Sequence, residues 1–185
     1  MIAKTLAAAA FALVVGLSAP APAQTAAGPQ DTLVMQLKDG SVTIRLRPDL
    51  APRHAERLRT LAGEGFYDGI VFHRVIEGFM AQTGDPTGTG RGGSSLPNLP
   101  AEFSDVPFTR GVVGMARSAD PNSANSQFFI MFDDAPSLNG QYTVVGEVVD
   151  GMDVVDAIKK GDRRANGVVD DPDRMISLRP AAGGQ

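Results

Sequence analysis

The chain has 185 residues, of which 43% are apolar and 21% charged, an ordinary balance for one globular domain with a sizeable core. Its 17 basic and 21 acidic side chains give a formal charge of -4, which provides no electrostatic reason to expect nucleic acid or an anionic membrane as a partner. There is no cysteine, so disulfides, thiolate catalysis and zinc–thiolate sites are excluded.

The first 23 residues have the pattern of a secretory signal peptide. Lys4 supplies a positive charge, residues 6–17 form an alanine-rich apolar run, and residues 21–23 (Ala-Pro-Ala) match the small-residue cleavage pattern. The alternative, a membrane anchor, is disfavoured because the run is shorter than the ~20 residues that span a bilayer. We therefore predict cleavage after Ala23, a flexible leader over 24–31, and export to the periplasm or outside the cell without a membrane attachment.

Two runs of alternating apolar and polar residues, 33–37 and 42–47, flank Asp39-Gly40. Two such runs joined by Asp-Gly are typical of a β-hairpin.

A helix is predicted next, with Pro52 tolerated in its first turn and Gly63 and Gly65 ending it. Its apolar positions recur at spacings of four, three and four, and are Ala51, Ala55, Leu58 and Ala62. Arg57 is expected to point away from that face. His54 lies next to the face, and we interpret it as structural.

Beyond residue 69 the apolar segments are short and are separated by Gly, Pro, Asn and Asp. They are 70–76, 79–82, 112–116, 127–132, 143–149 and 175–179. Together with the hairpin, they predict a mainly β protein, either a sandwich or a closed barrel, and about eight strands with two helices fit a small barrel whose ends need plugging. The second helix is predicted over 152–160 with Gly161 as its C-terminal cap. The folded domain is predicted to cover 32–180, with a polar loop over 162–174 and a tail over 181–185.

Three motifs are better explained without cofactor binding, metal binding or nucleophilic catalysis. Residues 88–93 match the G-x-G-x-x-G spacing, but the prolines that follow forbid the helix that a dinucleotide site needs, so we expect a surface loop that lets an extended ligand approach the backbone. A metal site would have to use His54, His73 and Asp85, which lack paired-ligand spacing. No serine lies in a nucleophile-elbow sequence. We therefore expect neither a metal nor a cofactor.

Arg74 is the residue that points to chemistry. It lies in an apolar segment, 72–82, where burying a guanidinium is costly unless it has a partner. A snorkelling side chain or an internal ion pair would be a purely structural explanation. Against it stand Gln82, Gln127 and the cluster 114–117, because amides and a guanidinium among aromatic and thioether groups suit a bound peptide backbone.

These segments resemble the sequence blocks of the cyclophilins, the peptidyl-prolyl cis-trans isomerases. The blocks are 72–85 (FHRVIEGFMAQTGD), 114–117 (GMAR), 125–130 (NSQFFI) and 138–148 (LNGQYTVVGEV). Four ordered blocks are a specific signal, and with the hairpin the resemblance covers about residues 32–180.

The resemblance implies a closed eight-stranded antiparallel β-barrel capped by two α-helices, and a set of roles. Arg74 corresponds to the catalytic arginine, and Gln82 to a polar residue that holds the substrate beside it. The remaining implied substrate-binding residues are Phe79, Met80, Met115, Ala116, Arg117, Gln127, Phe129, Leu138 and Tyr142. The position of Arg117 corresponds to one whose backbone pairs with the substrate chain. The implied partners are proline-containing segments of unfolded or exported polypeptides, and we expect a monomer.

The chain departs from the family pattern at two positions. Tyr142 stands where many members carry histidine, and an aromatic ring with a polar tip still suits a pocket rim. Ser137 stands where cyclosporin-sensitive members carry tryptophan, so the resemblance implies weak binding of cyclosporin. The segment 118–122 is also one residue longer than in typical eukaryotic members.

The residue types suit catalysed rotation about an Xaa-Pro bond. Amide resonance opposes that rotation with a barrier of about 18–20 kcal/mol. A guanidinium aimed at the prolyl nitrogen or carbonyl stabilises charge that localises only in the twisted state. Two alternatives remain, a peptide-binding chaperone with negligible turnover and a purely structural barrel. Arg74 favours the enzyme, because binding a proline ring requires no charge.

Overall fold

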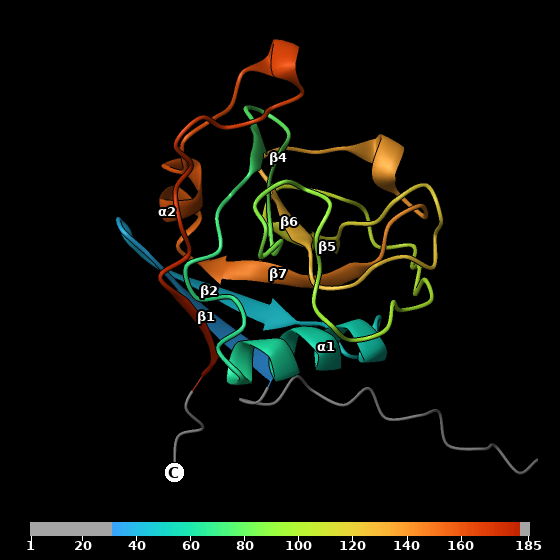
Figure 1. Cartoon of the computed structure of the whole chain (residues 1–185). Coiled ribbons are helices and arrows are strands. Elements are labelled where there is room, and N and C mark those ends of the chain that lie inside the picture. The colour runs from blue at the N-terminus through green and yellow to red at the C-terminus, as the bar shows by residue number, and fades with distance from the viewer. Residues whose placement is uncertain (1–30, 182–185) are drawn as a thin grey trace, which may run out of the picture.

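The structure, a computed structural model, describes residues 31–181. The predictions for the signal peptide, for most of the leader and for the tail beyond Ala181 lie outside the described residues. The chain forms one eight-stranded sheet with the order β3-β4-β6-β5-β7-β2-β1-β8, in which every neighbouring pair is antiparallel (Figure 1). The strands are β1 (Thr32–Leu37), β2 (Gly40–Leu46), β3 (Arg74–Ile76), β4 (Met80–Thr83), β5 (Val112–Met115), β6 (Phe128–Met131), β7 (Val144–Asp150) and β8 (Ser177–Pro180).

The predicted hairpin and all six further strands are confirmed. β1 and β2 pair with Leu37 opposite Gly40, so the two-residue turn consists of Lys38 and Asp39, one residue earlier than the predicted Asp39-Gly40. Their alternate residues are buried, which is the period-2 burial expected of strands with one face on a core.

β3 and β8 are the two edges of the sheet and do not pair directly with each other. The gap is spanned by irregular backbone just before each strand. The N–H of Gly69 donates to the carbonyl of Met175 at 2.8 Å, and the N–H of Phe72 donates to that of Asp173 at 2.9 Å. The predicted eight-stranded antiparallel architecture is therefore confirmed, and its closure depends on these loop contacts.

Two α-helices, α1 (Pro52–Gly63) and α2 (Met152–Asp156), lie on different sides of the sheet (Figure 1). The prediction for α2 was wrong in length, and Gly161 is not its cap. Helical bonding stops because the following backbone bonds elsewhere: the N–H of Lys159 donates to the Asp173 carboxylate at 2.8 Å, and that of Gly161 to the Val75 carbonyl at 2.9 Å. Among residues 31–181 no helix is long and apolar enough to cross a membrane.

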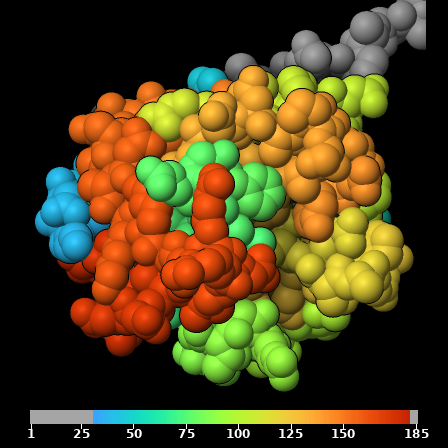
Figure 2. Space-filling model, turned by 90° about the horizontal axis from the view of Figure 1, so that it is seen from above, coloured from blue at the N-terminus to red at the C-terminus, as the bar shows by residue number. Residues whose placement is uncertain are grey.

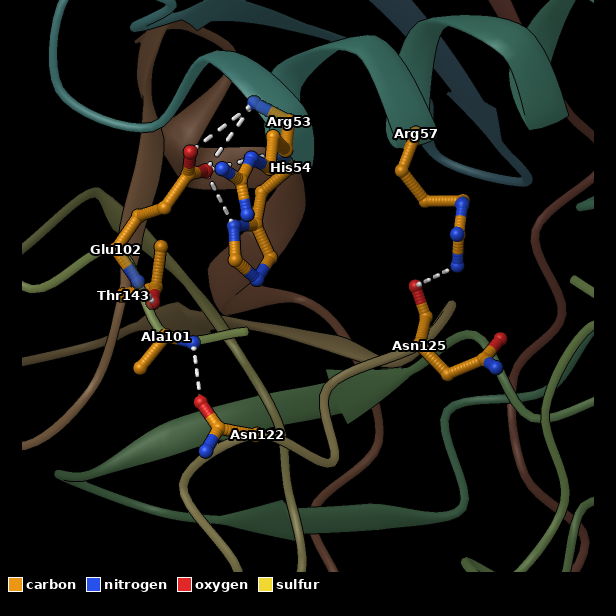
Figure 3. A network of polar contacts seen from close by, with 8 residues as sticks. All are labelled: Arg53, His54, Arg57, Ala101, Glu102, Asn122, Asn125 and Thr143. Carbon is orange, nitrogen blue, oxygen red and sulfur yellow. Dashed lines mark hydrogen bonds and ion pairs between the residues drawn. The ribbon is translucent and has the colours of Figure 1, made fainter. Parts of the chain in front are cut away.

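A carboxylate from a distant loop caps the start of α1 (Figure 3). Ala51 offers no side-chain cap, and Glu102 instead accepts the N–H groups of Arg53 and His54, each at 3.2 Å. The same carboxylate lies 2.6 Å from Nδ1 of the fully buried His54. Helix N-termini favour negative charge, so Glu102 both stabilises α1 and fastens its own loop to the helix. These contacts agree with the structural interpretation of His54.

Arg57 lies outside the apolar stripe of α1, and a loop covers it. It is only 8% exposed, and its guanidinium donates to the carbonyl of Pro97 at 2.8 Å. It also donates to the carbonyl of Asn125 at 3.4 Å (Figure 3). Helical periodicity describes one apolar face and does not reveal that a loop covers the next one. α1 thus supports the loops that contain Pro97 and Asn125.

Candidate active site

The register of four neighbouring strands places the key side chains in one row. Arg74 of β3 lies opposite Gln82 of β4, Gln82 lies opposite Phe129 of β6, and Phe129 lies opposite Gly114 of β5. Directly opposed residues share a face of an antiparallel sheet. Residues 74, 82, 114 and 129 therefore meet on one surface although they are far apart in sequence.

This row borders a cavity of about 180 Å³, which we call the apolar pocket. Nine of the eleven predicted site residues line it: Arg74, Phe79, Met80, Gln82, Ala116, Arg117, Phe129, Leu138 and Tyr142. In Figure 2 the green segment around β4, the orange segment that leads into β7 and the red-orange segment near η3 (Arg163–Ala165) lie beside one another on one face. Of the other two residues, Gln127 lies in an adjoining groove and Met115 is buried in the core.

Phe129 forms the floor of the apolar pocket, and two rings and a glycine hold it in place. Its ring stacks on Phe108 with centroids 5.8 Å apart and meets the edge of Tyr142 at 5.9 Å. A Cβ at Gly114 would collide with both Phe129 and Phe108. Glycine at this position therefore lets the two phenyl rings lie flat beneath the cavity.

The Arg74 guanidinium is held between two amide side chains, and no carboxylate pairs with it among the described residues. Nε and Nη2 donate to the backbone carbonyl and to Oδ1 of Asn166, each at 3.0 Å, while Nη1 donates to Oε1 of Gln82 at 3.2 Å. Burial lowers the pKa of Arg74, yet an arginine stays protonated at neutral pH. Nη1 also donates to the sulfur of Met80, a weak acceptor, at 3.8 Å. Five N–H groups with three strong partners leave two that can serve a ligand, one of them after giving up the sulfur contact. The internal ion pair that was the alternative explanation does not occur among residues 31–181.

Asn166 is a site residue that the sequence did not reveal. It lies in the segment predicted as a polar loop, has a left-handed backbone with φ of 55°, and ends η3. The chain then runs back along β3, where the N–H of Val75 donates to the carbonyl of Gly167 at 2.8 Å. Asn-Gly indicates a turn, but no local signal places that turn beside Arg74.

A directed chain of hydrogen bonds continues from Arg74 across the site. Gln82 accepts from Arg74 and donates its amide to Oε1 of Gln127 at 2.9 Å. Gln127 then donates to the carbonyls of Gly90 and Gly92 at 3.1 and 2.8 Å. Because each amide accepts from one side and donates to the other, both are held in one orientation.

The chain ends on Asp85, which is fully buried. Its carboxylate accepts the N–H groups of Gly90 at 2.6 Å and Gly92 at 3.1 Å, and both the N–H and the hydroxyl of Thr87. The glycine-rich stretch 88–93 is thus wrapped around an anion, and no helix follows it. It is a surface loop, as predicted, and it borders the site.

This loop forms one wall of a second cavity of about 600 Å³, which we call the polar groove. The groove shares Gln82, Ala116 and Arg117 with the apolar pocket, so the two are continuous. The backbone of Arg117 makes no hydrogen bond within residues 31–181, which leaves an N–H and a carbonyl available to an extended chain. The site therefore combines an apolar hollow, fixed amide and guanidinium donors, and unpaired backbone at its edge.

Comparisons with known proteins agree with this geometry. The family model described as cyclophilin type peptidyl-prolyl cis-trans isomerase/CLD matches residues 32–179. A "Probable peptidyl-prolyl cis-trans isomerase" of Brucella suis is 58% identical over 187 residues, covering 95% of this chain and 94% of the relative. The human "Peptidyl-prolyl cis-trans isomerase-like 3" is 42% identical over 125 residues, covering 65% of this chain and 77% of that protein.

Solved structures give the same result. The crystal structure of a cyclophilin from Hirschia baltica has a TM-score of 0.73 and 28% identity, covering 82% of this chain and 74% of that one. A Cryptosporidium parvum cyclophilin type peptidyl-prolyl cis-trans isomerase, crystallised in the presence of the dipeptide Ala-Pro, has the same TM-score and identity, covering 82% of this chain and 99% of that one. With a family match over nearly the whole described domain, this chain belongs to the cyclophilin family and is a peptidyl-prolyl cis-trans isomerase.

Proposed function

We propose that this isomerase turns Xaa-Pro bonds in the apolar pocket, with Arg74 as the catalytic group, and that its substrates are exported proteins during folding. The observation that carries the first part is the row formed by Arg74, Gln82 and Phe129, in which an unpaired guanidinium faces an apolar cavity. The proline ring lies against Phe129, Met80 and Leu138. The two N–H groups of Arg74 that have no oxygen acceptor contact the prolyl carbonyl or nitrogen.

Rotation requires no covalent intermediate. As the imide bond twists, amide resonance is lost and the prolyl nitrogen regains a lone pair. A fixed guanidinium in a partly dry site stabilises that localised charge more strongly than the planar ground state, which lowers the barrier. A rate gain of about 10⁵ corresponds to roughly 7 kcal/mol, a magnitude that one charge-assisted contact and a held backbone can supply together.

Residues 1–23 support the proposal that the substrates are exported proteins, because their pattern is that of a cleaved secretory signal. The test is to express the full chain in a bacterium with two membranes and to determine the N-terminus of the product. We expect a periplasmic protein that begins at Gln24, and that this protein accelerates the proline-limited refolding phase of a secreted protein. An uncleaved, cytoplasmic product would contradict export while leaving the isomerase assignment intact.

Asn166→Gly is expected to lower kcat/KM on an Xaa-Pro peptide by about threefold to tenfold, the worth of one partly exposed hydrogen bond to a charged group. The substitution removes the Oδ1 contact to Arg74, whereas the backbone carbonyl contact and the left-handed backbone, which glycine adopts freely, are retained. The loss should fall mainly on kcat, because Asn166 orients Arg74 and does not line the pocket.

Asp171→Gly is the matched control. Asp171 also has a left-handed backbone, with φ of 50°, and lies on the same C-terminal segment without touching Arg74. Its replacement should leave kcat/KM unchanged. An equal loss in both variants would show that the effect comes from loop flexibility and would remove the positioning role of Asn166.

A further inference from the structure

The two connected cavities are lined by an unusual set of charges. Arg74 and Arg117 line the apolar pocket, and Arg91 and Arg117 line the polar groove. No aspartate or glutamate of the described chain lines either cavity. This is unexpected for a protein whose formal charge is -4.

Of the ten described arginines that line neither cavity, six pair with a carboxylate: Arg45, Arg47, Arg59, Arg110, Arg164 and Arg179. None of the three arginines that line the cavities does so within the described residues. Arg117 donates only to the backbone carbonyls of Ser118 and Gln141, and its guanidinium lies 4.4 Å above the ring of Tyr142. The exposed side chain of Arg91 makes no hydrogen bond or ion pair within the described residues.

Two acidic groups lie near the groove without lining it. Asp120 is in the loop between the groove residues Ser118 and Ser123, and its carboxylate accepts the N–H of Asn122 at 2.9 Å. Asp85 is fully buried beneath the glycine-rich loop, and its oxygens are already occupied by backbone N–H groups and the Thr87 hydroxyl. The negative charge of Asp85 is therefore separated from the groove by the loop, whereas Arg91 and Arg117 carry their positive charges at the surface of the groove. A concave site of one sign raises the local concentration of ligands of the opposite sign.

We infer that the enzyme selects Xaa-Pro segments that carry an aspartate or glutamate within a few residues of the proline, held in the polar groove by Arg91 and Arg117. This inference rests on the proposed placement of the proline in the apolar pocket. The groove is continuous with that pocket, so a chain whose proline lies against Phe129 must pass it on one side. A substrate carboxylate in the groove pairs with the guanidinium of Arg91 or Arg117, which has no acidic partner among the described residues.

The test uses peptides that contain one proline and one variable position, which holds Glu, Gln or Lys. In successive peptide sets the variable position is moved, one residue at a time, along both sides of the proline. Exchange is measured by NMR, which needs no coupling protease. At one position we expect kcat/KM at low salt to be about threefold to fivefold higher for Glu than for Gln, and lower again for Lys. The difference should lie in KM and should vanish near 1 M salt, where screening is nearly complete.

Arg91→Gln should bring the Glu-to-Gln ratio of kcat/KM close to one. Arg53→Gln is the matched control, because Arg53 lies on α1, lines neither cavity and makes no side-chain ion pair. It should leave the ratio unchanged. A ratio of one at every position in the unsubstituted enzyme would overturn the inference, while turnover of the Gln peptides would keep the proposed function standing. Failure to turn over any of the peptides would instead contradict the proposed function.

Discussion

Replacing Arg74 with alanine is expected to lower kcat/KM on an Xaa-Pro peptide by about 10² to 10³, the effect typical of removing one preorganised donor from a site of developing charge. The physical reason is that the guanidinium meets the twisted imide and has no carboxylate partner to satisfy it in the free enzyme. Because Arg74 is half-buried and lies on the short edge strand β3, the fold should survive the change. Exchange spectroscopy on a peptide measures the rate, and circular dichroism checks the fold.

Arg74→Lys separates charge from geometry. Lysine keeps the positive charge but cannot bridge Gln82 and Asn166 with a planar fork, so we expect it to recover only a small part of the lost rate. Full activity in Arg74→Lys would mean that only the charge matters, and full activity in Arg74→Ala would remove the catalytic assignment. In the second case the site would be the peptide-binding groove of a chaperone.

Most of the strands could be predicted from the sequence, because their signals are local. Strict alternation around Asp39-Gly40 predicts the hairpin, and short apolar runs between turn residues predict the remaining strands. The site residues came from the resemblance to the cyclophilins, and the register of β3, β4 and β6 explains why three of them, Arg74, Gln82 and Phe129, form a row. Register depends on pairings between distant segments, which a single sequence does not reveal.

The errors share one physical origin. The burial of Arg57 was not foreseen, α2 was expected to reach residue 160, and Asn166 was missed inside a polar loop. In each case a segment far away in sequence takes over the hydrogen bonds: the loop around Pro97 for Arg57, Asp173 for the end of α2, and β3 for the turn at Asn166. Local propensity has no access to such partners.

Asp85 lies at the start of a loop and supports the site through a series of hydrogen bonds. Through Gly90 and Gly92 it holds the loop whose carbonyls accept from Gln127, and through Gln127 and Gln82 the same chain reaches Arg74. Burial alone would raise the pKa of Asp85, but hydrogen bonds from Gly92, Thr87 and Gly90 lower it from 3.8 to about 2. The folded protein therefore holds this carboxylate ionised.

Asp85→Asn is expected to reduce the free energy of unfolding at neutral pH by about 2–3 kcal/mol, because the amide points an N–H₂ group at backbone donors that the carboxylate satisfied. The sign of the pH effect follows from the lowered pKa. The stabilisation from Asp85, on the order of 2 kcal/mol, is complete above pH 4 and is lost as the pH falls from about 4 to about 2, so this step should be missing in the variant.

Burial also lowers the pKa of both His54 and His73, so the stability of the unsubstituted enzyme and of the variant should already decline together as the pH falls below about 6.5, where the unfolded chain binds the protons. Denaturant unfolding at a series of pH values distinguishes the two processes, with the exposed Asp105→Asn as the control that should follow the unsubstituted enzyme. Parallel stability curves for Asp85→Asn and the unsubstituted enzyme between pH 4 and pH 2 would show that the buried carboxylate is not held ionised. The hydrogen-bonded chain that ends on Asp85 would then need another anchor.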